Sequence, residues 1–375
     1  MSHPPPTILQ VLPALGQGGV ERGTVEIARA LVDAGGKALV ASAGGPMVAE
    51  LEAAGARHVT LPLDRKTPSA LLSNAGALAR LARAEDVRII HARSRFPAWS
   101  ALMAARRAGT RFVTTYHGSY NEDFPGKRLY NSVMARGERV IAISEHIAAL
   151  VRERHGVAPA RLRVIPRGVD PARFDPEIIE PAHLEALRRA WDLPEGRPVL
   201  LLPGRLTRWK GQAVLLQAAG MLDGPRPVVV LAGDAQGREA YRAELEALAD
   251  MTGTTLRMPG PVADMPAALA LADLVVHAST DAEAFGRTIV EAQAMRRPVI
   301  ASDLGAPRET VEEGVTGWRV PPGDAAGLAR AITHALSLPA DARAAMGEAA
   351  RAAVLARYTT RAMQDATLAV YRELA

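Results

Sequence analysis

Short apolar runs alternate with helical patterns along the whole chain, and this alternation constrains the fold more than any other feature. Between the runs, apolar residues recur at i, i+3 and i+4, as in Val20, Val25, Ala28 and Leu31. Strands that are apolar throughout and separated by helices are typical of a parallel sheet covered on both faces. We predict strands in the first half at 8–12, 38–42, 58–61, 87–91, 112–116, 140–143 and 162–166.

The alternation pauses over residues 168–198 and then restarts. This stretch contains five prolines and is typical of a linker around one short helix. The simplest interpretation is an α/β fold of two successive doubly wound parallel-sheet domains, with ligands bound at the carboxyl ends of the strands in a cleft between the domains. We place the domains at 1–170 and 171–355, and expect a terminal helix in 356–375 to pack back on the first domain. The second set of strands is predicted at 199–202, 228–232, 255–258, 274–277, 299–301 and 318–320.

Length and composition exclude several classes of protein. The 375 residues, 48% of them apolar, suffice for two domains with cores of their own. No apolar run reaches the roughly 18 residues of a membrane span, and the first residues lack the basic region and apolar length of a signal peptide. The absence of cysteine excludes disulfides, thiolate nucleophiles and zinc–cysteine sites. We therefore expect a cytoplasmic protein.

The net charge of +5 conceals a split between the two halves. Residues 1–167 carry 23 Lys and Arg against 13 Asp and Glu, a net +10, whereas residues 168–375 carry 22 against 27, a net −5. This asymmetry predicts that the first half meets an anionic partner. Nucleic acid is disfavoured, because aromatic residues make up only 4% of the chain and no arginine run is interleaved with them. A membrane surface or a phosphorylated substrate fits as well.

A glycine-rich loop follows the first predicted strand. Gly16, Gly18 and Gly19 stand directly before the helix that begins near Val20. Glycine lets backbone amides approach a ligand closely, and the positive end of the helix dipole suits phosphate. The spacing is not that of a dinucleotide-binding loop, and a plain strand-to-helix turn explains it equally well.

Two cations follow the first strand of the second half. Arg205 stands at the carboxyl end of that strand and Lys210 at the start of the next helix. Two cations converging there could clamp a diphosphate, Arg as a planar fork and Lys as a point charge. A solvated loop is the alternative, but this chain has only four lysines, which favours a specific role for Lys210.

Two glutamates frame the most specific motif. Glu283 and Glu291 are separated by seven residues, after the strand at 274–277. A helix beginning near Phe285 or Gly286 would leave Glu283 in the loop and place Glu291 about two turns along. The loop amides would then point at an anion, and the carboxylates could accept hydrogen bonds from sugar hydroxyls. The alternative is a helix with one acid favoured by its dipole and one solvated glutamate.

Further short motifs occur in order along the chain. They comprise Glu21-Arg22 after the glycine-rich loop, His117-Gly118, Val164-Ile165-Pro166-Arg167-Gly168-Val169-Asp170, Gly204-Arg205 with Lys210-Gly211, Gly233, Gly260-x-Val262, Pro298-Val299-Ile300-Ala301-Ser302, Gly305-x-Pro307-x-Glu309 and Gly314-x-x-Gly317. Each is weak alone. Together with the Glu-x7-Glu motif, the ordered set resembles the retaining GT-B glycosyltransferases of family 4, the group 1 transferases, over nearly the full length.

The resemblance implies a GT-B fold, in which two Rossmann-like domains face a central cleft, and roles for residues of the second half. Arg205 and Lys210 would hold the diphosphate of a nucleotide-sugar donor, and Glu291 the ribose. Glu283 would hold the donor sugar together with the residues that follow it. These residues are Ala284, Phe285, Gly286, Arg287 and Thr288.

Other roles implied by the resemblance fall on both halves. Gly18 and Gly19 would close over the phosphates, and Gly260 and Val262 would meet the base. His117 would lie near the sugar C6 or the reaction centre, and counts with Glu283, Arg205 and Lys210 as a catalytic residue.

The sequence departs from the family pattern at two places. Arg167 stands where Asn is usual, and residues 293–297 read Gln-Ala-Met-Arg-Arg, which puts the end of that helix in doubt. The run Asp281-Ala282-Glu283 looks like a metal-binding DxD, but the clamp cations already supply the charge that a metal would offer a leaving diphosphate. We therefore expect no metal and no cofactor. The isolated His91, His155 and His334 we interpret as structural or exposed.

The resemblance implies transfer of a sugar from a UDP- or GDP-sugar with retained anomeric configuration. We expect attack from the front face, assisted by the departing phosphate, without a carboxylate nucleophile. The acceptor is expected to be a glycan or lipid-linked molecule of cell-envelope biosynthesis, such as lipopolysaccharide, a glycolipid or a polysaccharide. Arg93, Arg95 and Tyr116 are candidate acceptor-side residues of the first half.

Membrane contact remains a second expectation for the basic half. The segment 69–83 carries Leu71, Leu72, Leu78 and Leu81 with basic residues, so it either packs its leucines on the sheet or contacts lipid. We favour packing, with electrostatic contact at the inner face of the cytoplasmic membrane. The alternative functions are a GT-B nucleotide-sugar epimerase, an inverting transferase, and a non-catalytic GT-B partner protein.

Overall fold

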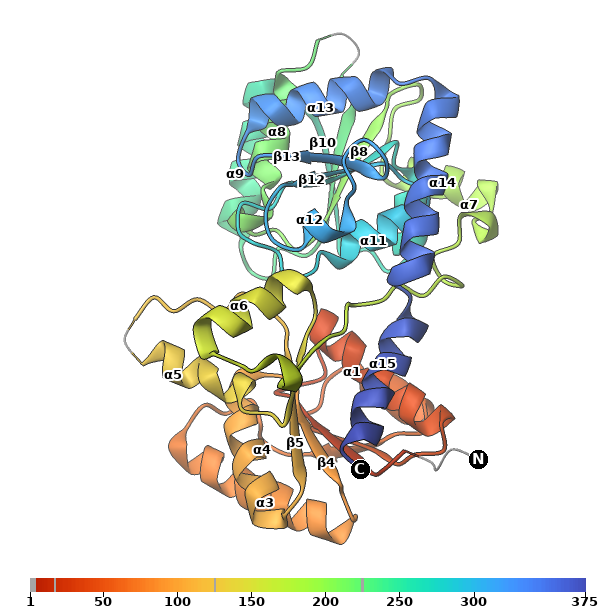
Figure 1. Cartoon of the computed structure of the whole chain (residues 1–375). Helices are drawn as coiled ribbons and strands as arrows, with labels where there is room; N and C mark the ends of the chain where they lie inside the picture. The colour runs from red at the N-terminus through yellow and green to blue at the C-terminus, as the bar shows by residue number, and fades with distance from the viewer. Residues whose placement is uncertain (1–4, 17, 125, 224–225) are drawn as a thin grey trace. The chain divides into compact units, whose positions relative to one another are not determined.

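The computed structural model describes residues 5–16, 18–124, 126–223 and 226–375. Residue 17 of the glycine-rich loop lies outside this range. The chain divides into two compact units (Figure 1), each described here by itself. Unit 1 comprises Met1–Arg167 and Thr360–Ala375, and unit 2 comprises Gly168–Thr359. None of the helices in the described ranges is long and apolar enough to cross a membrane.

Unit 1 is built on a parallel sheet of seven strands. Their order is β3-β2-β1-β4-β5-β6-β7, and each neighbouring pair runs parallel. All seven predicted strands are present; five of them are buried over all or most of their length, whereas the edge strands β3 and β7 are partly exposed. The strands are β1 Ile8–Val11, β2 Ala38–Ser42, β3 Arg57–Thr60, β4 Ile89–Ala92, β5 Arg111–Tyr116, β6 Arg139–Ala142 and β7 Leu162–Val164.

The helices of unit 1 begin and end at residues suited to those positions. Thr67 caps α3 by accepting a hydrogen bond from the Ala70 amide at 3.2 Å, and Ser144 caps α6 in the same way. Gly109 and Gly156 end α4 and α6 in the left-handed conformation. The helices are α1 Gly19–Asp33, α2 Val48–Ala53, α3 Pro68–Ala84, α4 Arg95–Ala108, α5 Lys127–Asn131, α6 Glu145–His155 and α15 Thr360–Glu373, with 3-10 turns η1 Ser132–Ala135 and η2 Pro159–Arg161.

Helix α15 belongs to unit 1 although it ends the chain. It packs against α1 (Figure 1), and its Met363, Leu368 and Tyr371 enter the core of this unit. The Tyr371 hydroxyl lies 2.6 Å from His91 Nδ1, and His91 Nε2 lies 2.7 Å from Thr115 Oγ1. These buried hydrogen bonds join α15 to β4 and β5, so His91 is structural.

The leucine-rich segment 69–83 packs into unit 1. It forms α3, whose most extensive contact with another element is with α4. Leu78 is buried and Leu71 and Leu81 are half-buried, whereas Leu72 is 56% exposed. The face that α3 buries is mostly alanine, and small side chains allow the close approach of two helices.

Unit 2 repeats the architecture with six strands. Their order is β10-β9-β8-β11-β12-β13, all parallel, and all six predicted strands are present. The strands are β8 Val199–Pro203, β9 Val228–Ala232, β10 Thr255–Gly260, β11 Leu274–His277, β12 Val299–Ser302 and β13 Gly317–Val320. The helices are α7 Pro181–Ala190, α8 Gln212–Gly220, α9 Glu239–Thr252, α10 Met265–Leu271, α11 Arg287–Ala294, α12 Pro307–Thr310, α13 Ala325–Ser337 and α14 Ala340–Arg357, with 3-10 turns η3 Pro176–Ile178 and η4 Arg208–Lys210.

Both sheets have one point at which the strand order reverses. In unit 1 it lies between β1 and β4, and in unit 2 between β8 and β11. Loops that leave such neighbouring strands run to opposite faces and open a crevice at the carboxyl ends, where ligands of α/β proteins bind. The two switch points therefore locate the candidate sites.

Candidate functional site

The predicted donor residues of unit 2 meet at its switch point. Lys210 follows β8 and Glu283 follows β11, which are neighbours in the sheet. The two loops touch, since the Thr280 amide donates to the Trp209 carbonyl at 2.8 Å. Gly211 adopts φ +73°, and a Cβ atom there would overlap the carbonyl of Ala278. Only glycine lets the loops approach this closely.

A buried ion pair joins these loops. Lys210 Nζ lies 2.7 Å from Glu283 Oε1, and both side chains are only 14% exposed. The other carboxylate oxygen, Oε2, is buried without a hydrogen-bond partner among the described residues. Lys210 also lies over the ring of Trp209, 4.4 Å from its centroid. The ion pair is thus held rigidly, and Glu283 Oε2 can still accept a hydrogen bond.

The ionisation of Glu283 follows from its neighbours. Burial is the largest single influence and alone would raise the pKa of this carboxyl, but Lys210, His277 and Arg205 together outweigh it, and the net pKa lies below its usual value. His277 Nε2 lies 4.0 Å from Glu283 Oε1. Burial lowers the pKa of His277 to about 4. At neutral pH the site therefore holds an anionic Glu283 beside a neutral imidazole.

The backbone around Glu283 is fixed from its other side. The Ala306 amide donates to the Glu283 carbonyl at 3.0 Å, and Gly305 forms a short parallel bridge with Glu283. Gly305 has φ +75°, and a Cβ there would lie 2.5 Å from the Glu283 carbonyl oxygen. The sequence motif around Gly305 thus supports the position of Glu283.

Helix α11 begins slightly later than predicted. Gly286, with φ +77°, precedes its first residue Arg287, so Glu291 lies about one turn into the helix and not two. The left-handed Gly286 turns the chain into the helix. Glu291 Oε1 lies 3.2 Å from Arg287 Nε one turn earlier, which orients the glutamate.

The other predicted donor residues occupy different environments. Phe285 is buried with its ring edge-on to Tyr358, so only its backbone can face a ligand, while Ala284 and Thr288 are half-buried. Gly260 ends β10 with φ +81°, and Val262 lies in the loop beyond it. Arg205 is exposed, its carbonyl accepting a hydrogen bond from Gln212 Nε2 at 2.9 Å.

In unit 1 the glycine-rich loop follows β1 at the switch point. Gly18 and Gly19 are exposed, and α1 begins at Gly19. A Cβ at Gly18 would lie 2.6 Å from Glu21 Oε2, so the carboxylate of Glu21 packs against the start of α1. This glutamate belongs to the Glu21-Arg22 motif.

His117 and two arginines form a second cluster at the carboxyl edge of unit 1. His117 follows β5, Arg93 follows β4, and Arg167 ends the segment after β7. Arg167 Nη2 donates to His117 Nδ1 at 2.9 Å. Burial, then the charges of Arg167 and Arg93, hold the pKa of His117 well below its usual range. His117 is therefore neutral.

The acceptor-side candidates of unit 1 need correction. The Tyr116 side chain is fully buried, with its hydroxyl 3.3 Å from His155 Nε2, so we assign it to the core. Arg93 is buried beneath α1 and does not line a surface. Arg95 is half-buried, with its guanidinium 4.1 Å from the centroid of the Tyr120 ring and its Nη1 donating to Asn131 Oδ1. Of the three, Arg95 is the one whose side chain retains exposed surface.

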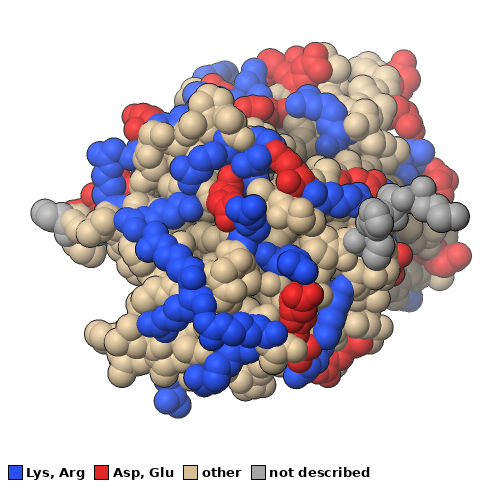
Figure 2. Space-filling view, turned by 60° about the horizontal axis from the view of Figure 1, so that its bottom comes forward, with Lys and Arg blue, Asp and Glu red and all other residues tan. Residues whose placement is uncertain are grey.

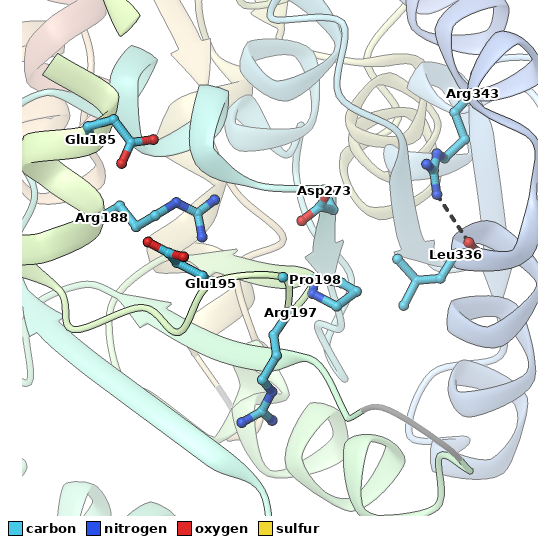
Figure 3. A pocket seen from close by; sticks show the side chains of 9 residues that line it. Glu185, Arg188, Glu195, Arg197, Pro198, Asp273, Leu336 and Arg343 are labelled. Atoms are coloured by element: carbon cyan, nitrogen blue, oxygen red, sulfur yellow. Dashed lines mark hydrogen bonds between the residues drawn. The ribbon is translucent and has the colours of Figure 1, made fainter. Parts of the chain in front are cut away.

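A separate hollow of unit 2 lies at the opposite, amino ends of β8 and β11 (Figure 3). Its lining mixes charges of both signs, among them Glu185, Arg188 and Glu195. Asp273 Oδ2 accepts from the Val199 amide at 2.8 Å, and Arg343 donates to the Leu336 carbonyl at 3.1 Å. These side chains hold the backbone, and we assign no ligand to this hollow. No group of three or more possible metal ligands occurs among the described residues.

The sequence did not assign a role to two residues of these clusters, His277 and Arg167. His277 ends β11 at the switch point, and its position directly after an apolar run was the available signal. Arg167 drew attention only because it replaces the usual Asn. Its contact with His117, 50 residues away, has no signature in the local sequence.

We expect unit 2 to lose stability when the pH is lowered and His277 must take up a proton. Its folded pKa of about 4 lies below the unfolded value of about 6.5, so the unfolded state binds more protons and stability falls as the pH drops from 7 toward 4. Between pH 7 and pH 5, His277 should account for a loss of about 2 kcal/mol. Urea unfolding followed by tryptophan fluorescence, which reports mainly on unit 2, measures it.

The variant His277→Gln should reduce this pH-dependent loss by that amount, and the exposed His183→Gln should not. An unchanged pH dependence in His277→Gln would contradict the buried, neutral imidazole.

Two family models match the chain in succession. That of Glycosyltransferase Family 4 matches residues 17–173, and that of Glycosyl transferases group 1 matches residues 184–353. The D-inositol 3-phosphate glycosyltransferase of Mycobacterium tuberculosis is 33% identical over 244 residues, which is 64% of this chain and 49% of the relative. The chain thus spans about half the length of the curated relatives it matches.

Solved structures resemble the whole chain. A glycosyltransferase from Rickettsia africae is 35% identical, with 99% of each chain covered and a TM-score of 0.92. Anabaena Alr3699/HepE, solved in complex with UDP-glucose, is 25% identical, with 98% of this chain and 100% of the other covered and a TM-score of 0.86. The predicted GT-B fold is confirmed, and the chain belongs to the group 1 glycosyltransferases of family 4.

Proposed function

We propose that unit 2 binds a nucleotide-sugar and that the chain transfers its sugar to an acceptor with retained anomeric configuration. One observation carries the proposal: the buried Lys210–Glu283 pair stands at the switch point of the unit 2 sheet, with Glu283 Oε2 left without a partner among the described residues. A cation beside an unused, buried acceptor suits a ligand that offers a phosphate and a hydroxyl close together.

Lys210 and Arg205 supply the positive charge for the diphosphate. The ammonium group has three N–H donors, and one of them suffices for Glu283. Arg205 is exposed beside it and near enough to lower the pKa of Glu283. As the sugar–phosphate bond breaks, negative charge grows on the diphosphate, so fixed cations stabilise the transition state more than the ground state.

The two glutamates are suited to the hydroxyl groups on either side of the diphosphate. Glu283 would accept a hydrogen bond from the donor sugar through Oε2. Glu291, held by Arg287 at 3.2 Å, would accept from the ribose. A carboxylate that stays ionised is a stronger acceptor than a neutral oxygen, and Lys210 keeps Glu283 in that state.

The proposed reaction needs no carboxylate nucleophile. The bond between the anomeric carbon and the diphosphate oxygen breaks, and the acceptor hydroxyl oxygen forms the new bond on the same face. The acceptor proton passes to the departing diphosphate. We propose that no metal is required, because Lys210 and Arg205 provide the charge that a metal would otherwise offer.

The relatives support a choice of donor and acceptor class. The complexes of Alr3699/HepE with UDP and with UDP-glucose support a UDP-sugar. The mycobacterial relatives are named for D-inositol 3-phosphate, and the basic first half of this chain suits an acceptor with an anionic group. We propose a phosphorylated or lipid-linked acceptor of cell-envelope glycan synthesis.

We expect purified protein to transfer or hydrolyse a UDP-sugar in the presence of EDTA, and the new glycosidic bond to keep the donor's anomeric configuration by NMR. Lys210→Ala and Glu291→Ala should each lower the initial rate by about 100-fold, since each removes a contact to the donor. Lys66→Ala and Glu246→Ala, exposed residues of the same types, serve as controls with unchanged rates.

An inverted product would contradict retention and favour an inverting transferase. Wild-type rates in both Lys210→Ala and Glu291→Ala would contradict the proposed donor site.

We also propose that unit 1 makes electrostatic contact with an anionic membrane. Figure 2 shows Lys and Arg side chains gathered over the lower part of the face in view, with few acidic side chains among them. The exposed apolar side chains Leu72, Phe124 and Leu129 belong to the same unit. The exposed basic residues of α3 to α5 and the segments that follow these helices are Arg80, Arg83, Arg88, Arg106, Arg107, Arg111, Arg128 and Arg136.

Binding to vesicles with anionic lipid should weaken as salt is added. The double variant Arg80→Ala/Arg106→Ala should lose about 30-fold in partition coefficient, because each basic side chain contributes about 1 kcal/mol at such a surface. Arg330→Ala, on unit 2, is the matched control. Equal sedimentation with neutral and anionic vesicles would contradict this surface.

A further inference from the structure

Two arginines of unit 1 are buried beside His117, although the proposed donor contacts do not use them. Arg93 is 2% exposed and Arg167 is 6% exposed. Both lie over one residue of α1: a Cβ at Gly23 would overlap Arg167 Nη1 and would lie 3.0 Å from Arg93 Nη2. The absence of a side chain at Gly23 is what lets the two guanidinium groups lie against the helix.

The hydrogen bond from Arg167 to His117 has only one possible direction. A guanidinium group has five N–H donors and no acceptor, so Arg167 Nη2 donates and His117 Nδ1 accepts, at 2.9 Å. A neutral imidazole that accepts at Nδ1 carries its proton on Nε2. His117 Nε2 is buried and has no partner among the described residues. The ring therefore presents an N–H donor that a ligand must satisfy.

The surroundings of His117 also oppose its protonation. Arg167, Arg93 and His91 are the titratable groups that lower its pKa, after burial itself. The Tyr120 hydroxyl faces the His117 backbone amide at 3.4 Å and is held neutral, because burial raises its pKa. A charged imidazole would also carry a proton on Nδ1. That N–H group would face the N–H donor of Arg167, and the hydrogen bond between them would be lost.

We propose that Arg167 is a positioning residue that fixes His117 as the neutral tautomer with its proton on Nε2, so that His117 serves the reaction as a hydrogen-bond donor to a substrate oxygen and not as a proton acceptor. This inference rests on the proposed transfer function for its chemical meaning. The state of the imidazole can be measured without any substrate, so the two can fail separately.

The tautomer is read directly by NMR of the full chain labelled with nitrogen-15 at histidine, with His117→Gln identifying the signal. Wild-type His117 should carry its proton on Nε2 and stay neutral through the pH range in which an ordinary histidine titrates. In Arg167→Met the population of the Nε2–H tautomer of His117 should fall, and the pKa of the ring should rise. Arg167→Lys, which keeps a charged donor, should fall between them, and Arg163→Met, a half-buried arginine paired with Glu373, should match the wild type.

A glycine substitution tests the same contact without removing the arginine. Gly23→Ala should displace the Arg167 side chain and shift the His117 tautomer as Arg167→Met does. Gly76→Ala is the matched control, because it also lies in a helix but its Cβ would meet only Arg80 Nη1, at 3.5 Å. Should Arg167→Met fail to fold, Gly23→Ala still decides the question.

Kinetics separate donation from a merely structural role. Arg167→Met and Gly23→Ala should lower kcat by about tenfold or more with little change in the donor KM, as expected when a donor to the transition state is lost. His117→Gln, whose amide can donate, should retain more activity than His117→Phe. A proton on Nδ1 or a charged ring at pH 7 in the wild type, an unchanged tautomer in Arg167→Met, or equal activity of His117→Gln and His117→Phe would overturn the proposal.

Discussion

The buried contact between Lys210 and Glu283 is the interaction on which the proposed donor site of unit 2 depends. It joins the loops that leave β8 and β11, the two neighbouring strands between which the strand order of the unit 2 sheet reverses. An ion pair with both side chains 14% exposed is costly to bury unless its geometry is good and its remaining polar atoms are satisfied. Here one carboxylate oxygen is unsatisfied, which is expected where a ligand completes the network.

Glycine makes this arrangement possible at a few positions. Gly211 lets the two loops touch, Gly305 lets a neighbouring segment reach the Glu283 backbone, and Gly286 turns the chain into α11. In unit 1 the same logic applies to Gly23, against which two guanidinium groups rest. Each glycine allows close packing next to a charged side chain, so the positions of the charged clusters depend on these glycines.

The strands and their parallel order could be predicted from the sequence because most strands are apolar runs buried on both faces, although the edge strands β3 and β10 are partly exposed. The residues Arg205, Lys210, Glu283 and Glu291 could be proposed as donor-site candidates because they follow those runs in the order seen in the family that the sequence resembles. Contacts over long separations could not be read in this way. The partners Lys210 and Glu283 lie 73 residues apart, and His91 and Tyr371 lie 280 apart. Tyr116 was misplaced because an aromatic residue at a strand's end can face either the core or the ligand.

We propose that Lys210 and Glu283 together form the donor site, with Lys210 on the diphosphate and Glu283 on the sugar. Calorimetric titration with UDP and with the UDP-sugar tests it most directly. Lys210→Ala should weaken binding of both by at least about tenfold, or about 1.4 kcal/mol. Glu283→Gln should leave UDP affinity nearly unchanged and weaken only the UDP-sugar. Binding of UDP to Lys210→Ala with wild-type affinity would contradict the account.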